Sequence, residues 1–267
     1  MVNLINWHPI LLALAGTGIA FSGTAIGAAF VFFTRREPSG KIQKLFLGFA
    51  SGVMIAASVW SLLLPAAEYA AERGAPEWLP TAAGFLAGAG FLFAMDKLLP
   101  HHHVQSVLPE GPKSSLRKST KLIFAVTLHN FPEGMAVGLA FALAGAADSS
   151  VTMAGAFALA IGIAVQNLPE GAVISLPLKA EGFSKRKAFA FGILSGAVEP
   201  VAGVLGALVV GVTLAAIPWA LSFAAGAMIY VVVDELVPSA YSEHTDFGTL
   251  GAVGGFVLMM LLDTALG

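Results

Sequence analysis

Two short segments of this chain carry side chains that could bind a cation. They run His129-Asn130-Phe131-Pro132-Glu133-Gly134 and, 37 residues later, Gln166-Asn167-Leu168-Pro169-Glu170-Gly171. Each combines amides or an imidazole with a proline and a carboxylate. This mixed nitrogen and oxygen set, without thiolate, suits borderline divalent metals such as Zn²⁺, Fe²⁺, Mn²⁺ or Cd²⁺. Mg²⁺ and Ca²⁺ prefer sites made of oxygen throughout, so the histidine argues modestly against them.

The spacing within each segment places its polar side chains on one face of a helix, because residues three and four apart are neighbours there. The two faces comprise His129, Asn130 and Glu133 on one helix, and Gln166, Asn167 and Glu170 on the next. A further carboxylate, Glu199 of Glu199-Pro200, lies near the middle of the following apolar run. We therefore expect three carboxylates at a similar depth.

The elements that must position these side chains are membrane helices. The 267 residues are 57% hydrophobic and only 11% charged, with a mean hydropathy of +0.83 and no cysteine. Soluble domains carry roughly 25% charged residues. Runs of about 20 apolar residues can cross a bilayer. Eight such runs predict an all-α integral membrane protein with one transmembrane domain over residues 1–267: about 8–33, 44–68, 78–99, 121–146, 151–178, 188–214, 216–241 and 247–266.

Lysine and arginine set the orientation of these spans. Of the 14 basic residues, only Arg73 falls outside the first, third and fifth connections and their flanks. These connections are therefore predicted to be cytoplasmic, with both termini outside the cell's inner (cytoplasmic) membrane. The first run lacks a basic leading region, so we expect a retained span rather than a signal peptide. Helices four and five then run in opposite directions, which predicts a pseudo-symmetric, inverted pair.

The cost of burying carboxylates in lipid indicates what the pair is for. An ionised carboxylate at the centre of a spanning helix costs about 2.5–3.5 kcal/mol. No lysine or arginine of this sequence lies at the depth of Glu133, Glu170 and Glu199. We therefore expect the positive charge to come from a proton or a metal cation that binds and leaves.

The two motif prolines add oxygen donors at the same depth. Pro132 and Pro169 have no N–H, so each frees the carbonyl four residues earlier, on Leu128 and Val165. We expect helices four and five to be broken there. Broken helices with polar groups at corresponding points of two halves are typical of a transporter site.

Other polar residues are weaker candidates for a path to and from this site. Glu68, Asp96 and the pair Asp234 and Glu235 lie near helix ends, where they could guide a cation or simply mark an interface. The third connection, residues 100–120, is expected to be a flexible cytoplasmic loop. Its three histidines could bind a metal weakly or belong to a polar linker: His101, His102 and His103. We expect Asp263 to face solvent.

These residues resemble the ZIP (Zrt/Irt-like) divalent metal transporters, with the closer match to the bacterial GufA-like branch. The paired motifs, Glu199-Pro200 and the run Asp96-Lys-Leu-Leu-Pro-His carry the resemblance, which covers all eight helices. It implies one transporter domain, a homodimer, and movement of helices one, four, five and six against the others.

The resemblance also implies a centre for two metal ions in which both motif glutamates bridge. One metal would be held by His129, Glu133, Gln166 and Glu170, and the other by Asn130, Glu133, Asn167, Glu170 and Glu199. Asp234 and Glu235 fall where the family has ligands on the exit path. Many members have histidine at the position of Gln166, so one imidazole is missing here.

The expected function is uptake of a divalent transition metal into the cytoplasm by alternating access. Zinc is the first candidate, followed by iron, manganese and cadmium. The expected partners are the metal ions, the bilayer and a second copy of the chain, with neither a nucleic acid nor a prosthetic group. One alternative is a cation or proton channel that uses the same glutamates. The other is an intramembrane metalloenzyme, although the sequence lacks the His-Glu-x-x-His pattern of many zinc hydrolases.

Overall fold

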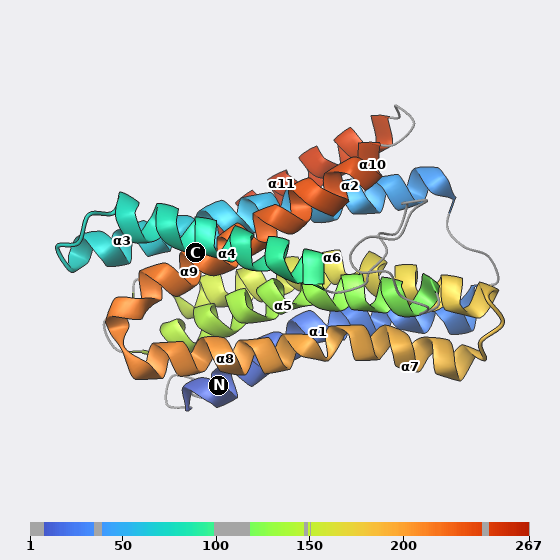
Figure 1. Cartoon of the computed structure of the whole chain (residues 1–267), viewed down its shortest axis with the longest axis horizontal. Coiled ribbons are helices and arrows are strands. Elements are labelled where there is room, and N and C mark those ends of the chain that lie inside the picture. The colour runs from blue at the N-terminus through green and yellow to red at the C-terminus, as the bar shows by residue number, and fades with distance from the viewer. Residues whose placement is uncertain are drawn as a thin grey trace.

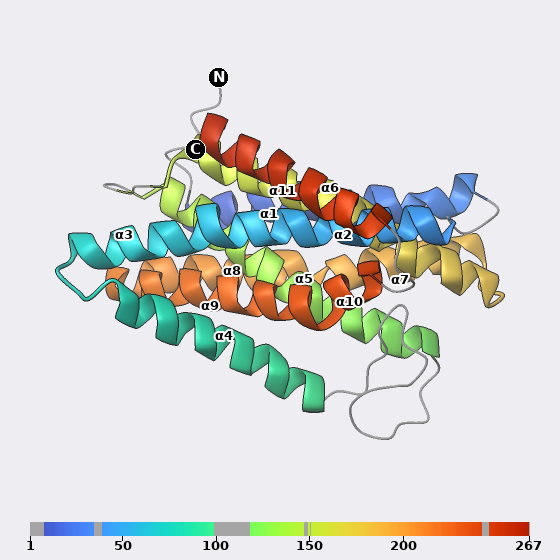
Figure 2. The same ribbon diagram turned by 90° about the horizontal axis from the view of Figure 1, so that it is seen from above.

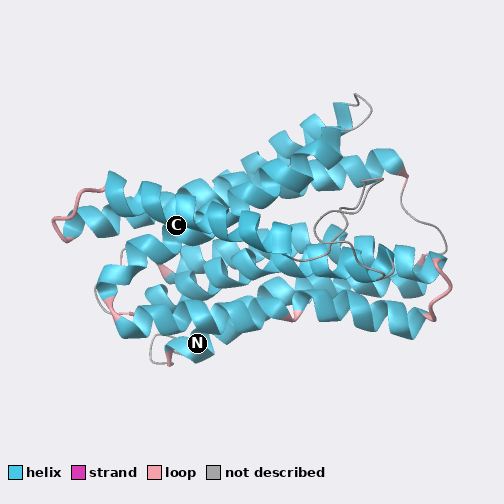
Figure 3. Ribbon diagram, viewed as in Figure 1, coloured by secondary structure: helices cyan, strands magenta, loops and turns pink. Residues whose placement is uncertain are grey.

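The computed structural model describes residues 8–34, 39–98, 118–146, 149, 151–241 and 246–266. Helices and the turns between them account for all of these residues, and no strand occurs among them (Figure 3). The predicted all-α class is therefore confirmed. The predicted loop at 100–120 lies, apart from its last three residues, outside the described residues, as do His101, His102 and His103.

The helices follow the apolar runs closely. In chain order they are α1 Pro9–Phe33, α2 Gly40–Ala57, η2 Ser58–Leu63, α3 Leu64–Glu72, α4 Trp78–Leu98, α5 Lys118–Ala144, α6 Met153–Ala180, α7 Lys185–Gly196, α8 Val198–Val212, η3 Leu214–Ala216, α9 Ile217–Val231, η4 Val232–Leu236, α10 Val237–Tyr241 and α11 Asp246–Leu266. Within the described residues, 7 helices are long and apolar enough to cross a membrane. The helix left out is α5, which has 27 residues but carries the polar segment around Glu133. The count of eight spans therefore stays a prediction.

Two of the spans contain a π-helical turn that the apolar pattern does not predict. The turn η2 ends two residues before Pro65, and η4 ends two residues before Pro238. In each, the next backbone N–H bonds five residues back, from Leu64 to Val59 and from Val237 to Val232. A proline ring clashes with the carbonyl four residues earlier in a regular helix, and the wider turn relieves that clash.

The breaks expected at the motif prolines are not confirmed. Helices α5 and α6 continue through Pro132 and Pro169, because a proline removes one hydrogen bond without necessarily ending a helix. The sixth span is divided instead, at Ala197 between α7 and α8. Pro200 lies just beyond this turn and has no N–H to offer the carbonyl of Gly196, so the regular helix is weakened there.

The helices pack as two lobes. We call α1, α5, α6, α7 and α8 the site lobe, because α1 packs chiefly on α6 and α5 chiefly on α8. The frame lobe comprises α2, η2, α3, α4, α9, η4, α10 and α11, and it is built on the pairs α2–α11 and α4–α9. Fewer contacts join the lobes, mainly α6 with α11 and α2, and α5 with α9. Figures 1 and 2 show α11 lying along α2, and α8 along α5.

The two ends of the bundle differ in charge. At one end α2 begins and α6 ends, and Lys41, Lys179 and Lys185 lie there; we call this the lysine-rich end. At the opposite end α3 ends and α6 begins, and Arg73 lies there. Helix α1 begins and α11 ends in the half of the bundle that holds the α3–α4 turn (Figure 1). This arrangement agrees with the predicted alternation of the spans.

Candidate metal centre

Close packing at the motif glycines brings three helices of the site lobe together. A Cβ on Gly134 would overlap the backbone of Glu199, so α5 approaches α8 only because residue 134 is glycine. A Cβ on Gly171 would likewise overlap the backbone at Thr24, which lets α6 lie against α1. Such small residues allow helix backbones in membranes to approach closely. The glycine that ends each motif therefore sets the position of the glutamate before it.

Six of the seven predicted site residues are buried, and Glu170 is partly exposed. Asn130, Glu133, Asn167 and Glu199 are each 0% exposed, although no apolar environment stabilises such groups without a partner. Helices α5, α6 and α8 supply these side chains. The sequence therefore predicted correctly that they face the protein interior.

Glu199 is held by partners on two neighbouring helices. The hydroxyl of Thr24 on α1 donates to Oε1 of Glu199 at 3.2 Å, and the Nδ2 amide of Asn167 donates to the same oxygen at 3.1 Å. Glu199 also lies in the first turn of α8, where the helix dipole favours a negative charge. The other oxygen, Oε2, is buried and has no hydrogen-bond partner among the described residues.

The amides are fixed through their nitrogens, which leaves oxygens for a ligand. Asn130 donates from Nδ2 to the backbone carbonyl of Ser195 at 3.1 Å, and Gln166 donates from Nε2 to Oδ1 of Asn167. Of the eight buried side-chain oxygens without a hydrogen-bond partner in the described residues, six belong to this region. They are Asn130 Oδ1, Glu133 Oε1 and Oε2, Gln166 Oε1, Glu170 Oε2 and Glu199 Oε2.

The carboxylates of the region act on one another. Those of Glu133, Glu199 and Glu235 are close enough to Glu170 to interact electrostatically, and Glu133 lies beside the side chains of Gln166 and Asn167. Buried charges of one sign repel strongly, because the interior screens them poorly. A bound cation would coordinate the free oxygens, and its positive charge would offset the repulsion between the carboxylates.

A cavity of about 140 Å³ leads from this region toward the lysine-rich end. His129, Gln166 and Glu170 line its inner part, and Gln43 and Pro177 line it nearer that end. Its wall also holds Glu235 from η4, whose Oε2 is 2.8 Å from Nε2 of His129; this pair therefore joins the two lobes.

The described residues do not present a ready-made cluster of three His, Cys, Asp or Glu side chains around one point. Amides lie among the carboxylates, and His129 is engaged by Glu235. A two-metal centre is therefore not confirmed. The role of the seven residues as metal ligands stays a prediction.

The residues predicted to form a path for the cation lie in different parts of the bundle. Glu235 lines the cavity, whereas the neighbouring Asp234 is exposed outside its wall. Glu68 is exposed and lines a second cavity, of about 230 Å³, at the opposite end of the bundle. Asp96 is buried against α9, where its Oδ2 accepts a hydrogen bond from Tyr230 at 3.3 Å. That position ties α4 to α9 and lies outside both cavities.

The structure also corrects the expectation that Asp263 faces solvent. This residue lines the second cavity rather than only facing solvent, and its Oδ1 accepts a hydrogen bond from Ser61 at 2.7 Å. Its Oδ2 is buried and finds no hydrogen-bond partner in the part of the chain that the structure describes. The π-helical turn η2 supplies Ser61, so this pairing depends on a feature that was missed in the sequence.

Sequence reasoning also missed the partners that hold the site. Thr24 lies in the first apolar run and Ser195 just before the break in the sixth, and both are fully buried. The available signal was Thr24 between Gly23 and Gly27, since a small polar residue on a close-packed helix face can bond to a neighbouring helix.

The fold and the site define a class: a helical membrane protein with a buried polar site that is rich in free oxygens. Comparison with known proteins agrees. Residues 110–263 match the family model described as ZIP Zinc transporter. The chain therefore belongs to the ZIP family, whose members are transporters rather than enzymes, which removes the metalloenzyme alternative.

Individual relatives match along nearly the whole chain. Zinc transporter ZIP11 of Homo sapiens is 37% identical, covering 97% of this chain and 98% of its own. Zinc transporter GufA of Myxococcus xanthus is 36% identical over 95% and 98% of the two chains. Zinc transporter ZIPB of Bordetella bronchiseptica is 35% identical over 96% and 81%.

Proposed function

We propose that this protein carries zinc, or a similar divalent transition metal, into the cytoplasm across a bacterial inner membrane. The observation that carries the proposal is the group of six unpartnered buried oxygens on α5, α6 and α8. Native proteins rarely leave such atoms unsatisfied, and each exception calls for a ligand, ion or water. Membership of the ZIP family and the names of the relatives support zinc as the cargo.

In this proposal Glu133 and Glu170 are the central ligands. The free oxygens of Asn130, Gln166 and Glu199 complete the set, with Asn167 steering Glu199. His129 would join the ligands when it leaves Glu235. The family resemblance implies two metal ions that share the glutamates, and we include this two-metal centre in the proposal.

The two cavities support alternating access. The cavity at the lysine-rich end reaches Gln166 and Glu170, whereas the opposite cavity stops at Ala140 and Gly155. Gly155 and Gln166 are 11 residues apart on α6, or roughly 16 Å along a helix. Of these two cavities in the described residues, the one that reaches the site opens toward the lysine-rich end, which positive charge marks as the cytoplasmic one.

The two lobes provide the parts that would move. All seven predicted ligands lie on the site lobe, and Glu235 contacts one of them, His129, from the frame lobe. Sliding of one packed group past another is a known form of domain movement. The inverted symmetry, the homodimer and the external position of both termini remain predictions.

A transport assay separates this carrier from the channel alternative. Purified protein in proteoliposomes should take up ⁶⁵Zn²⁺ at an initial rate that saturates with concentration, because each cycle carries bound metal. Excess Cd²⁺, Fe²⁺ or Mn²⁺ should compete at the same site. Uptake should weaken in acid, since protons compete for the carboxylates. A rate that stays proportional to metal concentration would favour the channel.

A further inference from the structure

A separate apolar cavity of about 580 Å³ lies between the lobes, on the lysine-rich half of the bundle. Helices α1 and α6 of the site lobe form one wall, and α2 and α11 of the frame lobe form the other. Its lining is hydrocarbon apart from Thr34 and includes Phe30, Phe49 and Leu250. A volume in the range of ligand pockets, at bilayer depth, suits an acyl chain.

Two lysines lie at the lysine-rich end of this cavity, one on α2 of the frame lobe and the other on α6 of the site lobe. Lys41 lies one helical turn before the lining residue Leu45, and its Nζ is 5.7 Å from the ring centre of Phe247 on α11. Lys179 lies three residues after the lining residue Leu176, and its Nζ donates to the carbonyl of Thr34 at 2.8 Å. Asp246 in the first turn of α11 and Glu181 at the C-cap of α6 are acidic residues at this end.

We propose that an anionic phospholipid occupies this cavity, with an acyl chain between the lobes and its phosphate at Lys41 and Lys179. The combination of an apolar cavity and a cationic rim matches both parts of such a lipid. Basic pockets between helices on the cytoplasmic side bind anionic head groups, and each lysine near the surface adds roughly fivefold in affinity. The lipid touches both lobes, so it would also influence their relative movement.

The cavity can be filled without disturbing the packing around it. Gly254 lines the cavity, and a Cβ there would meet nothing within 4 Å. The substitution Gly254→Phe therefore places an aromatic ring where the acyl chain would lie. Gly90→Phe is the matched control, because Gly90 is also exposed and open but lies on α4, away from the cavity.

The test is native mass spectrometry of the delipidated full-length protein, titrated with phosphatidylglycerol or with phosphatidylcholine of identical chains. We expect one tightly bound phosphatidylglycerol, at least tenfold weaker phosphatidylcholine binding, and loss of the bound lipid in Gly254→Phe but not in Gly90→Phe. Lys41→Gln and Lys179→Gln should each weaken phosphatidylglycerol by about fivefold, whereas Lys97→Gln on α4 should not.

Three results would overturn the proposal. The first is equal binding of the two lipids, and the second is unchanged phosphatidylglycerol binding in Gly254→Phe. The third is a change from dimer to monomer in Gly254→Phe with lipid binding intact, which would assign the cavity to a second copy of this chain. If Gly254→Phe does not fold, unchanged binding in the exposed-site variant Lys41→Gln contradicts the proposal on its own.

Discussion

The two carboxylate oxygens of Glu199 have different roles: one bonds to the protein, and the other is left for the candidate metal centre. Oε1 accepts hydrogen bonds from Thr24 and Asn167, while Oε2 is buried and free. Asn130 and Gln166 follow the same rule, since each bonds to the protein through nitrogen and leaves its oxygen free. Partners of this kind orient ligands before a metal arrives, and their loss typically lowers metal affinity 10- to 100-fold.

Thr24→Val should therefore weaken metal binding by about tenfold without unfolding the protein. The substitution keeps the shape of the side chain and removes the bond to Glu199. Thr17→Val is the control, because Thr17 is equally buried on α1 but bonds to the carbonyl of Ala13 in its own helix. Titration of purified protein with Zn²⁺ measures both, and equal affinities for the two variants would contradict this role of Thr24.

Gln166→His tests the missing imidazole. Gln166 is 1% exposed, lines the cavity and has a free Oε1, so a histidine there would face the same centre. Nitrogen ligands favour Zn²⁺ over Mn²⁺. We expect the Zn²⁺ concentration for half-maximal uptake to fall on the order of tenfold, with less change for Mn²⁺. A higher value for Zn²⁺ would show that Gln166 is not positioned as a ligand.

Residue types and spacing within one helix were enough to predict that these side chains face the protein interior, whereas their role as ligands stays a prediction. The rule for neighbours three and four apart covers contacts along a helix, and it placed Asn130 and Glu133 together correctly. It says nothing about contacts between helices. Thr24 and Ser195 were missed for this reason, since their partners are 175 and 65 residues away.

At the scale of elements, proline had more than one effect. Pro65 and Pro238 follow π-helical turns, Pro132 and Pro169 lie within continuous helices, and Pro200 follows a break. The sequence shows that each proline lacks a donor. Which of these outcomes follows depends on how the neighbouring helices satisfy the freed carbonyl, and that information lies outside the local sequence.

Gly171→Ala should push α6 away from α1. The added Cβ meets the backbone of Thr24, so the bond from Thr24 to Glu199 should be lost as well. Overpacking of this kind costs about 1–3 kcal/mol, and the thermal midpoint should fall. Gly18→Ala is the control on α1, because a Cβ there meets nothing within 4 Å. Equal midpoints for the two variants would argue against this close approach.

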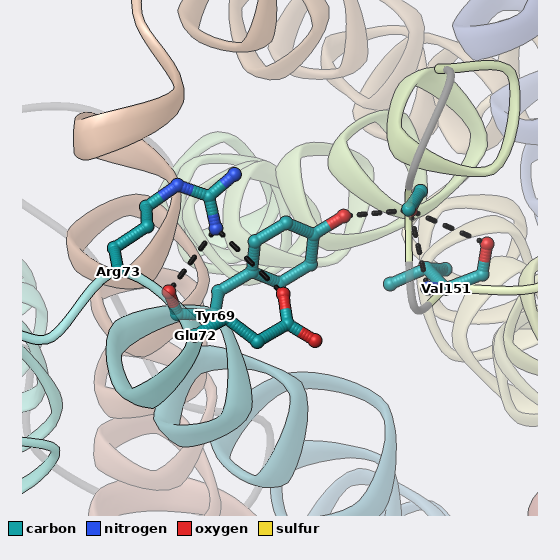
Figure 4. A network of polar contacts seen from close by, with 5 residues as sticks. Tyr69, Glu72, Arg73 and Val151 are labelled. Atoms are coloured by element: carbon teal, nitrogen blue, oxygen red, sulfur yellow. Dashed lines mark hydrogen bonds and ion pairs between the residues drawn. The ribbon is translucent and has the colours of Figure 1, made fainter.

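A polar contact joins the two lobes at the end opposite the lysines. The hydroxyl of Tyr69 on α3 lies 2.6 Å from Oγ of Ser149, which in turn accepts a bond from the N–H of Val151 before α6 (Figure 4). Arg73 lies over the Tyr69 ring, with its Cζ 4.9 Å from the ring centre (Figure 4). The contact joins the frame lobe to the segment between α5 and α6 of the site lobe.

Tyr69→Phe should make opening toward that end easier. One neutral hydrogen bond contributes about 0.5–1.5 kcal/mol, so the open state should gain roughly 2- to 10-fold in population. The chain has 0 cysteines, and a single Ala140→Cys in the second cavity can report on access to a maleimide. Thr81→Val controls for loss of a hydroxyl, because Thr81 bonds only locally, to the carbonyl of Glu77 just before α4. Unchanged labelling in Tyr69→Phe would exclude this contact as a closure.

At the scale of the molecule, the residue pattern predicted the order and alternation of the helices, whereas their grouping was expected only from the family resemblance. That resemblance set helices one, four, five and six against the others, and the site lobe is formed from those four. Apolar length and the alternation of lysine and arginine carry the first kind of information. The grouping depends on which helix faces meet, as at α2–α11 and α1–α6, where glycine Cβ positions on one helix face the backbone of the other. With glycine so frequent in this chain, no single pair could be assigned a partner beforehand.

The central claim is that Glu133 and Glu170 bind the transported metal, and the most direct test is the initial rate of ⁶⁵Zn²⁺ uptake into proteoliposomes. Glu133→Gln and Glu170→Gln keep size and remove the charge, whereas Asp96→Asn alters a buried carboxylate that contacts Tyr230 outside the site. We predict uptake at the level of empty liposomes for both glutamate variants and a rate near wild type for Asp96→Asn. Wild-type uptake by correctly inserted Glu133→Gln and Glu170→Gln proteins would contradict the account.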